Sequence, residues 1–534
     1  MNCISSARTY RIVSGTLILL ALLMGLSFET AGAAPLRLPA VFDDHAVLQR
    51  NVSVPVWGWA EPGETVAVAI AGQTAAATVG ADGHWRVDLA PLAAGGPYEL
   101  TVSAPSGSRT LSDILVGEVW LASGQSNMQW SIKHSDGWDA EQAHWANDKI
   151  RIAMVFREHS PVPLEDLRGW TPWAPCTAET LDTCYKGEGF SGVSYYFAKY
   201  LQAELGVPVG IINTSWGGTR IEPWTPPVGF EPIPALENIT TQIRLNQPES
   251  AEYQQALKEA LEQVEAWLPA ARTALANHTF APALPSIASE SGLNNEGRPT
   301  TLYNAMVAPL VPYANRGFIW YQGESNRGDG MLYRDKMEAL INGWRSVWND
   351  NALACYFAQL APFDYGKDPE ALAEIWEAQT AAAAIPGAGM AVINDIGNVK
   401  DIHPRNKDDV GKRLAWLALN KTYGKRDIVC EGPVFDRYEV VDNAMRVYFK
   451  NVKTLSTRDG AAPNWFQICG ADGVFHEATA VIDGASVVLT AADVATPIAV
   501  RFAWDHCAEP NLKNEADLPA SAFRAGNVPA EGAA

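Results

Sequence analysis

Five short runs of nearly continuous apolar residues follow one another in the middle of the chain, and they predict buried parallel strands. The runs cover residues 118–122, 209–213, 317–321, 354–357 and 390–394. Between and after them, residues 193–205, 331–348 and 407–423 repeat apolar side chains at helical spacing. Strands that alternate with helices predict an α/β fold, a three-layer domain around a parallel sheet. In such sheets the chemistry lies where the strands end, so the residues after each run are the functional candidates.

The flanks of this region have a different pattern. Short β-rich runs broken by turns predict a β-sandwich-like domain over 36–115, and strands return over 427–534. The α/β domain then occupies 116–426, with a helical insertion near 250–277 that Pro269 is expected to interrupt. The pattern leaves open whether this insertion is a lid or only packing.

The first 33 residues have the pattern of a secretory signal peptide. Arg8 and Arg11 precede an apolar run over 12–26, and Ala31-Gly32-Ala33 is a small-x-small cleavage site. The alternative is an uncleaved membrane anchor, for which the run is short. We therefore expect a secreted or periplasmic protein.

Cleavage would remove Cys3 and leave six cysteines, an even number that is compatible with disulfides in an oxidising compartment. Cys176 and Cys184 are the expected pair. No Cys-x-x-Cys or His-x-x-x-His spacing occurs, so the sequence predicts no metal site.

Charge limits the possible partners. The 534 residues carry a formal charge of -20, which repels phosphate backbones and anionic lipids. We expect no nucleic-acid partner and, after loss of the leader, no membrane partner. Apolar residues make up 47% of the chain and charged residues 19%, as in compact globular proteins. The sequence does not give an oligomeric state.

Three of the apolar runs lead into polar or glycine-rich segments. The first leads into Gly124-Gln125-Ser126, where a tight turn would present a nucleophilic hydroxyl and a free backbone N–H. The second leads to Gly217-Gly218, which let the backbone approach a ligand closely. The third leads to a dense polar cluster over 322–326. Among the nine histidines, His403 alone directly follows an apolar strand of the α/β pattern, which makes it the candidate base.

Four blocks in this order resemble the sialate O-acetylesterase-like branch of the SGNH hydrolases. They are Gly124-Gln125-Ser126-Asn127-Met128, Trp216-Gly217-Gly218-Thr219, Trp320-Tyr321-Gln322-Gly323-Glu324-Ser325-Asn326 and Asp401-Ile402-His403-Pro404. The resemblance implies a flavodoxin-like domain, no metal or other cofactor, and deacetylation of acetylated sugars. Ser126 would attack the acetyl carbonyl and His403 would act as its base.

The resemblance also implies an oxyanion hole. It would be formed by the Ser126 N–H, a Gly217 or Gly218 N–H, and a side-chain amide from Gln322, with Asn326 as the alternative.

The acid of the triad is less clear, because Lys400 stands where many SGNH enzymes have Asp. Asp401 is the first candidate to orient His403, Asp395 is the second, and a backbone carbonyl is the third.

Arg220 and Glu324 are expected to contact substrate, although Arg220 could equally form a structural ion pair. The substrate is either an O-acetylated sialic acid or an acetylated plant polysaccharide fragment. The alternative function is a non-catalytic carbohydrate-binding protein.

Overall fold

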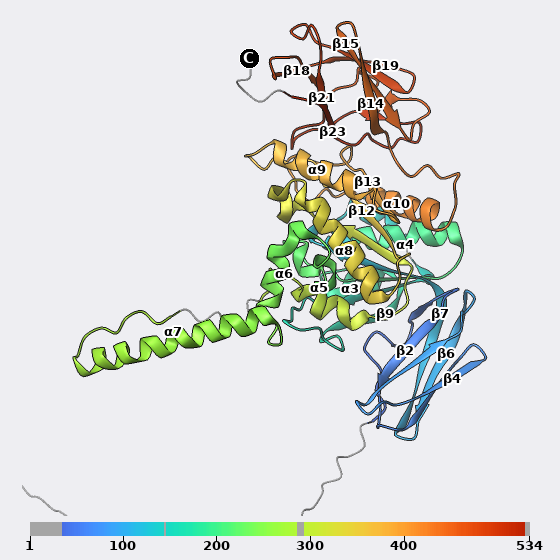
Figure 1. The fold of residues 1–534 in the computed structure, drawn as a ribbon. Coiled ribbons are helices and arrows are strands. Elements are labelled where there is room, and N and C mark those ends of the chain that lie inside the picture. The colour runs from blue at the N-terminus through green and yellow to red at the C-terminus, as the bar shows by residue number, and fades with distance from the viewer. Residues whose placement is uncertain (1–34, 144–145, 286–292, 529–534) are drawn as a thin grey trace, which may run out of the picture.

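The computed structural model describes residues 35–143, 146–285 and 293–528, and a seven-stranded sheet forms its centre (Figure 1). The strand order is β13-β12-β11-β7-β10-β8-β9, and every neighbouring pair is parallel except β8 with β9. The strands are β7 (Gly107–Gly124), β8 (Asn147–Val155), β9 (Trp170–Cys176), β10 (Val209–Asn213), β11 (Gly317–Tyr321), β12 (Ala354–Ala358) and β13 (Ala388–Ala391). This confirms the predicted α/β class. The sequence analysis missed β8 and β9.

Long helices cover the sheet in packed pairs, α4 with α10 and α8 with α9. Gly411 allows the first pair to lie close together, since a Cβ there would stand 2.6 Å from Cβ of Tyr196. The helices of the domain are α1 (Ser126–Gln129), α2 (Trp138–Glu141), α3 (Ala178–Gly187), α4 (Gly192–Leu205), α5 (Pro227–Phe230), α6 (Glu237–Arg244), α8 (Leu332–Trp348), α9 (Glu370–Ala382) and α10 (Lys407–Leu417). A π-helical turn over Ala418–Thr422 extends α10, which accounts for the predicted length of 407–423.

Strand β7 belongs to two sheets at once. Its first half pairs with β6 and β1 of the N-terminal domain, and its second half pairs with β10 and β11 of the central sheet. The predicted boundary between residues 115 and 116 therefore falls inside one continuous strand. The N-terminal strands are β1 (Val47–Gln49), β2 (Val54–Trp59), β3 (Thr65–Ile70), β4 (Gln73–Thr78), β5 (His84–Leu89) and β6 (Gly95–Ala104).

The passage of β7 between the domains is held by a buried carboxylate. Glu118 is 1% exposed and accepts hydrogen bonds from Gln49 Nε2, Arg50 Nε and Arg316 Nε at 2.9, 2.5 and 3.2 Å. The three donors come from the end of β1, the residue after it and the residue before β11. Glu118 therefore ties the N-terminal domain to the central sheet.

The C-terminal region forms two four-stranded antiparallel sheets and a short two-stranded one. Its strands are β14 (Val434–Val441), β15 (Ala444–Lys450), β16 (Ser456–Thr457), β17 (Phe466–Cys469), β18 (Phe475–Glu477), β19 (Thr479–Asp483), β20 (Ser486–Thr490), β21 (Ala499–Phe502), β22 (Leu512–Lys513) and β23 (Phe523–Gly526). Figure 1 shows this region at the opposite end of the molecule from the N-terminal domain.

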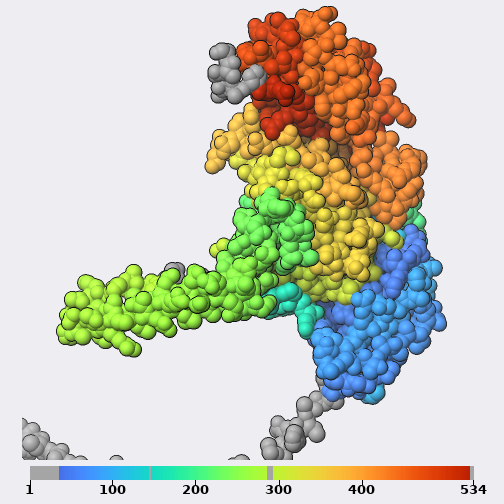
Figure 2. Space-filling model, viewed as in Figure 1, coloured from blue at the N-terminus to red at the C-terminus, as the bar shows by residue number. Residues whose placement is uncertain are grey.

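The helical insertion is an arm that points away from the body (Figures 1 and 2). Helix α7 covers Ala251–Ala276 and continues through Pro269. The expected interruption at Pro269 is therefore wrong. Proline has no N–H for the carbonyl four residues before it, so the helix passes Pro269 with one backbone hydrogen bond fewer.

Two expectations concern the cysteines and the leader. All six cysteines in the described part are free thiols, so the expected Cys176–Cys184 disulfide is absent. Burial raises the pKa of both thiols to about 12. The leader over 1–33 lies outside the described residues. No helix among the residues that the structure describes has the length and apolar character needed to cross a bilayer.

We expect Glu118→Ala to lower the free energy of unfolding by about 3 kcal/mol, because it leaves two arginines without their shared partner. Thermal or urea denaturation measures the effect. Asp88→Ala is the control, since Asp88 pairs with Arg86 on the surface and its loss should change stability by less than about 1 kcal/mol. Equal effects of the two variants would contradict the anchoring role of Glu118.

Candidate active site

Ser126 lies where β7 turns into α1. Gly124 has φ 139°, and a Cβ on it would stand 2.2 Å from the Tyr321 carbonyl oxygen, so this turn requires glycine. The Gln125 N–H donates to the same oxygen at 3.0 Å. Within the described ranges, the Ser126 N–H has no acceptor. The turn therefore holds the Ser126 hydroxyl at the carboxyl end of the central strand, with a backbone donor beside it.

His403 comes from the loop between β13 and α10 and contacts this hydroxyl. Its Nε2 lies 2.9 Å from Ser126 Oγ. The imidazole stacks on Trp130, with ring centroids 4.9 Å apart and an interplanar angle of 20°. The structure thus joins the predicted nucleophile and base, which are 277 residues apart in the sequence.

The two acid candidates make other contacts. Asp401 Oδ1 accepts the backbone N–H of His403 at 3.0 Å, so this carboxylate fixes the loop instead of the ring. Asp395 forms a bidentate pair with Arg413 at 2.6 and 2.7 Å. Ser126 is the one hydrogen-bond partner of the His403 ring in the described part of the chain. The geometry is that of a Ser–His pair with the stacked Trp130 supporting the ring.

A buried polar chain lies beneath this pair. The Asn127 side-chain amide donates to Glu324 Oε1 at 2.6 Å and to the Ile402 carbonyl at 2.9 Å. Lys407 Nζ donates to Asn127 Oδ1 at 2.7 Å. Asn127, the residue after Ser126, thereby connects the loop after β11, the residue before His403 and the first turn of α10.

The charges of this chain act on the base. Burial lowers the pKa of His403, the Lys407 cation lowers it further, and Asp401 raises it. Burial also lowers the pKa of Lys407 to about 7, against the opposing effect of Glu324 and Asp401. A lowered pKa keeps His403 neutral, and therefore able to accept a proton, to more acidic pH.

Ser126 and His403 line a cleft of about 690 Å³. Gly217 also lines it, and a Cβ on Gly217 would stand 3.2 Å from Cβ of Ser126. The Gly217 N–H donates to Oε1 of Gln129, another lining residue, at 2.7 Å. Gly218 does not line the cleft, and its carbonyl accepts the Ser325 hydroxyl at 3.0 Å.

The two predicted oxyanion amides are committed elsewhere. Gln322 is fully buried, and its amide donates to the Thr219 carbonyl and to Asn326 Oδ1 at 3.1 and 2.8 Å. Asn326 donates to Glu222 and Asp329. Neither side chain lines the cleft, so the prediction that one of them faces the oxyanion is not supported by their positions. Their role is to hold the loop after β11 in place.

The two predicted substrate contacts also lie outside the cleft. Arg220 pairs with Glu222 and Asp329 at 2.9 Å, and Lys336 joins the same carboxylates. The structural ion pair is thus the correct interpretation of Arg220. Glu324 has one oxygen on Asn127 and one buried without a partner, and burial raises its pKa. Glu324 therefore belongs to the polar chain and not to the substrate surface.

Several lining residues were missed by the sequence analysis. They are Gln129, Trp130, Ser131, Lys133, His134, Met154, Arg157, Gly187, Glu188, Gly189 and Trp216. Trp130 follows Ser126 by one helical turn, a spacing that would have identified it. Arg157 pairs with Glu188, and Lys133 Nζ lies 3.2 Å from Asp182 Oδ1. The cations that these two residues bring to the cleft are thus already neutralised.

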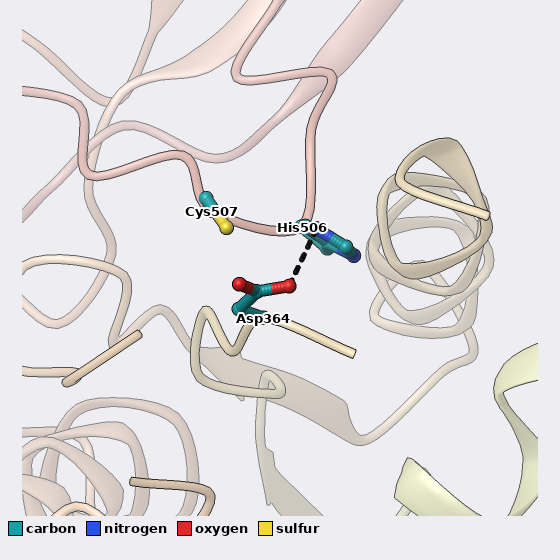
Figure 3. A group of neighbouring side chains, drawn as sticks. All are labelled: Asp364, His506 and Cys507. Carbon is teal, nitrogen blue, oxygen red and sulfur yellow. Dashed lines mark ion pairs between the residues drawn. The ribbon is translucent and has the colours of Figure 1, made fainter. Parts of the chain in front are cut away.

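One group of possible metal ligands occurs among the described residues, and it lies away from the cleft. Figure 3 shows Asp364, His506 and Cys507, whose ligand atoms lie within 4.8 Å of one another. His506 Nε2 lies 3.4 Å from Asp364 Oδ1. Burial and nearby carboxylates raise the pKa of the Cys507 thiol. The group is a polar contact between the loop after β12 and the C-terminal region.

Comparisons with known proteins show the family of this chain. Residues 116–273 and 287–419 match the profile of the family described as carbohydrate esterase, sialic acid-specific acetylesterase. Rat sialate O-acetylesterase is 28% identical over 519 residues, which cover 88% of this chain and 89% of the relative. The human enzyme is 27% identical over 467 residues, with 80% and 79% covered. The solved structure of a carbohydrate acetylesterase from Xanthomonas citri is 35% identical in sequence and superimposes with a TM-score of 0.76. The match covers 92% of this chain and 99% of that one.

The fold, the site and these matches together define a carboxylic ester hydrolase. The chain belongs to the sialic acid-specific acetylesterase family of carbohydrate esterases, and acetyl esters of carbohydrates are the substrates consistent with that family.

The charges around His403 predict opposite pH effects for two substitutions. Lys407→Met removes a cation that lowers the pKa of His403, so the acidic limb of the kcat/KM profile should move to higher pH. Asp401→Asn removes a charge that raises this pKa but keeps an oxygen for the His403 N–H, so the limb should move to lower pH. Hydrolysis of 4-nitrophenyl acetate against pH measures both shifts.

Lys400→Met is the control, because Lys400 is an exposed lysine on the same loop and is absent from the charges that act on His403. Shifts of the same sign in Lys407→Met and Asp401→Asn would contradict the assignment of these charges.

Proposed function

We propose that this protein is a secreted serine O-acetylesterase that removes acetyl groups from carbohydrate hydroxyls through an acetyl-enzyme. The observation that carries the proposal is the 2.9 Å contact between Ser126 Oγ and His403 Nε2 inside an open cleft. A secreted or periplasmic location is supported by the leader over 1–33. Mass spectrometry of the mature protein from the medium or periplasm should find a chain that begins after residue 33.

In the proposed first step, Ser126 Oγ attacks the acetyl carbonyl while His403 Nε2 takes the hydroxyl proton. The tetrahedral intermediate then breaks the bond between the carbonyl carbon and the sugar oxygen, and His403 gives its proton to that oxygen. Water attacks the acetyl-enzyme in the second step with His403 again as base. Acetate leaves, and Ser126 regains its proton.

The oxyanion is proposed to bind two backbone donors. The Ser126 N–H has no acceptor within the described ranges, and the Gly217 N–H donates to the side-chain oxygen of Gln129. Because Gln129 Oε1 is a carbonyl oxygen in the cleft, we infer that the oxyanion displaces it and takes over its hydrogen bond. The close approach of Gly217 to Ser126, where a Cβ on Gly217 would stand 3.2 Å from Ser126 Cβ, supports a shared role for the two donors.

The charges of the cleft favour neutral sugars over sialic acids. A sialic acid carries a carboxylate, which needs an available cation. Arg157 is paired with Glu188 and Lys133 with Asp182, while Trp130 and Trp216 line the cleft, and aromatic side chains pack well against the apolar parts of a sugar. We therefore propose acetylated neutral oligosaccharides, such as plant polysaccharide fragments, as the preferred substrates.

We expect Ser126→Ala and His403→Ala each to lower kcat for acetate release by about a thousandfold or more. The double variant should be little worse than either single variant, because the two groups act as one unit. Acetate assays on folded variants, checked by circular dichroism, measure this. Near wild-type turnover in either single variant would refute the mechanism.

The substrate preference is tested by comparing acetylated xylo-oligosaccharides with O-acetyl sialic acid. We expect kcat/KM to be roughly tenfold or more higher for the neutral substrate, because the carboxylate finds no unpaired cation. Glu188→Gln frees Arg157 and should raise the relative activity on O-acetyl sialic acid. A wild-type preference for the sialic acid would contradict the substrate proposal while leaving the esterase mechanism intact.

A further inference from the structure

The arm built on α7 leaves an unusual amount of apolar surface uncovered. Leu261, Leu268 and Leu275 of α7 are 53%, 39% and 78% exposed, and Phe280 after the helix is fully exposed. Figure 2 shows that the arm extends into solvent well beyond the rest of the molecule. Large exposed apolar side chains that gather on one element mark an interaction surface.

Six apolar residues of α7 have the spacing of a coiled-coil seam; Leu257, Val264 and Ala271 are already half-buried, and the three leucines named above are exposed. Their spacing alternates between four and three residues through three heptads, which is the a/d pattern of paired helices. The seam consists of Leu257, Leu261, Val264, Leu268, Ala271 and Leu275. Pro269 does not belong to the seam, so it does not interrupt the apolar row.

Residues 277–285, the described part of the segment that follows the helix, do not cover the exposed leucines. Trp267 Nε1 donates to the Pro282 carbonyl at 3.0 Å, and the Thr279 N–H donates to the Ala274 carbonyl at 2.9 Å. These contacts place the returning segment against the helix face that carries Trp267 and Ala274. The row of exposed leucines lies beside that face, because positions one and eight residues after Trp267 are rotated by about 100° from it.

The charges beside the seam of one α7 are complementary to those beside the seam of a second, antiparallel α7. Lys258, Glu265 and Arg272 are seven residues apart, so they form one flanking row with alternating sign. When two such helices pair antiparallel, Glu265 of each copy can face Arg272 of the other. This two-fold arrangement buries both leucine rows at once.

Among the residues that the structure describes, the exposed leucines of the arm have no comparable partner. Helix α7 makes its main contacts with α6, near the base of the arm, and none of its residues lines the Ser126 cleft. The position of the apolar row therefore does not favour a lid over the cleft.

We propose that α7 is a dimerisation arm, which pairs antiparallel with α7 of a second copy through the Leu261–Leu268–Leu275 row. The catalytic cleft of each copy stays outside the contact. This inference does not depend on the proposed function.

The first test is sedimentation velocity of the leader-free chain from about 1 to 100 μM. We expect a reversible dimer, and we expect the double variant Leu261→Glu/Leu268→Glu to remain monomeric with unchanged helix content and unchanged hydrolysis of 4-nitrophenyl acetate. The control is Val441→Glu/Val481→Glu, two valines of the C-terminal region that are each 59% exposed, which should dimerise like the wild type.

The second test uses the charges. Glu265→Arg and Arg272→Glu should each weaken self-association by roughly tenfold or more, because like charges then face one another. An equimolar mixture of the two variants should restore it as a heterodimer, and so should the double variant Glu265→Arg/Arg272→Glu. If the substitutions acted only on the stability of the helix, neither the mixture nor the double variant would recover the association.

Three outcomes would overturn the proposal. They are a monomer at every concentration, a dimer that survives the two leucine substitutions, and an arm whose leucine substitutions abolish binding to lipid vesicles or to an acetylated polysaccharide while the wild type stays monomeric.

Discussion

The continuity of β7 is the constraint on which the rest of the structure depends. The strand begins in the N-terminal domain, becomes the central strand of the main sheet and ends two residues before Ser126. The position of the nucleophile is therefore set by two sheets and by the buried Glu118 between them. A shift of β7 in either sheet would move Ser126 relative to His403, which is held by a different loop. The N-terminal domain is thus part of the framework of the catalytic site, although none of its residues lines the cleft.

Asn127 has the corresponding role for the loops. Its single amide group contacts Glu324, the Ile402 carbonyl and Lys407, which come from three segments far apart in the sequence. These contacts fix the backbone on both sides of the Ser–His pair with buried hydrogen bonds, which are strong and directional where water is excluded. The cost is a lysine and a glutamate carboxyl that are both buried and joined through Asn127; burial and the Lys407 cation lower the pKa of His403, while Asp401 raises it.

The sequence predicted the sheet from local pattern, and it predicted that Ser126 and His403 come together from local pattern and from the order of the four family-like blocks. Apolar runs mark buried strands, and Ser126 and His403 lie in segments that follow such runs at the edge where parallel strands end. Gln322, Asn326, Glu324 and Arg220 were expected at the oxyanion or the substrate, but none of them lines the cleft, and this difference has a physical reason. Every polar residue after a strand has the same local pattern, and its partners decide whether it faces the cleft or holds a loop.

Those partners lie too far away along the chain to be inferred from one sequence. Gln322 bonds to the Thr219 carbonyl from 103 residues away, and Asn127 bonds to Glu324 across 197 residues. Strands β8 and β9 were missed because β8 starts with polar residues and β9 contains two prolines at the sheet edge. The sequence predicted the helix of the arm, but it did not predict that the helix would be exposed, because exposure depends on which other elements pack against it.

The free cysteines have a consequence for how this protein can mature. In the described part, five of the six are buried, and burial raises the pKa of every one of the six thiols. Protonated, buried thiols react slowly with oxidants and with other thiols. The described fold thus requires no oxidative crosslinking to form, and it is compatible with reducing as well as oxidising compartments. Its stability comes from a large apolar core and from strand β7, which pairs in two sheets, and not from disulfide bonds between the described cysteines.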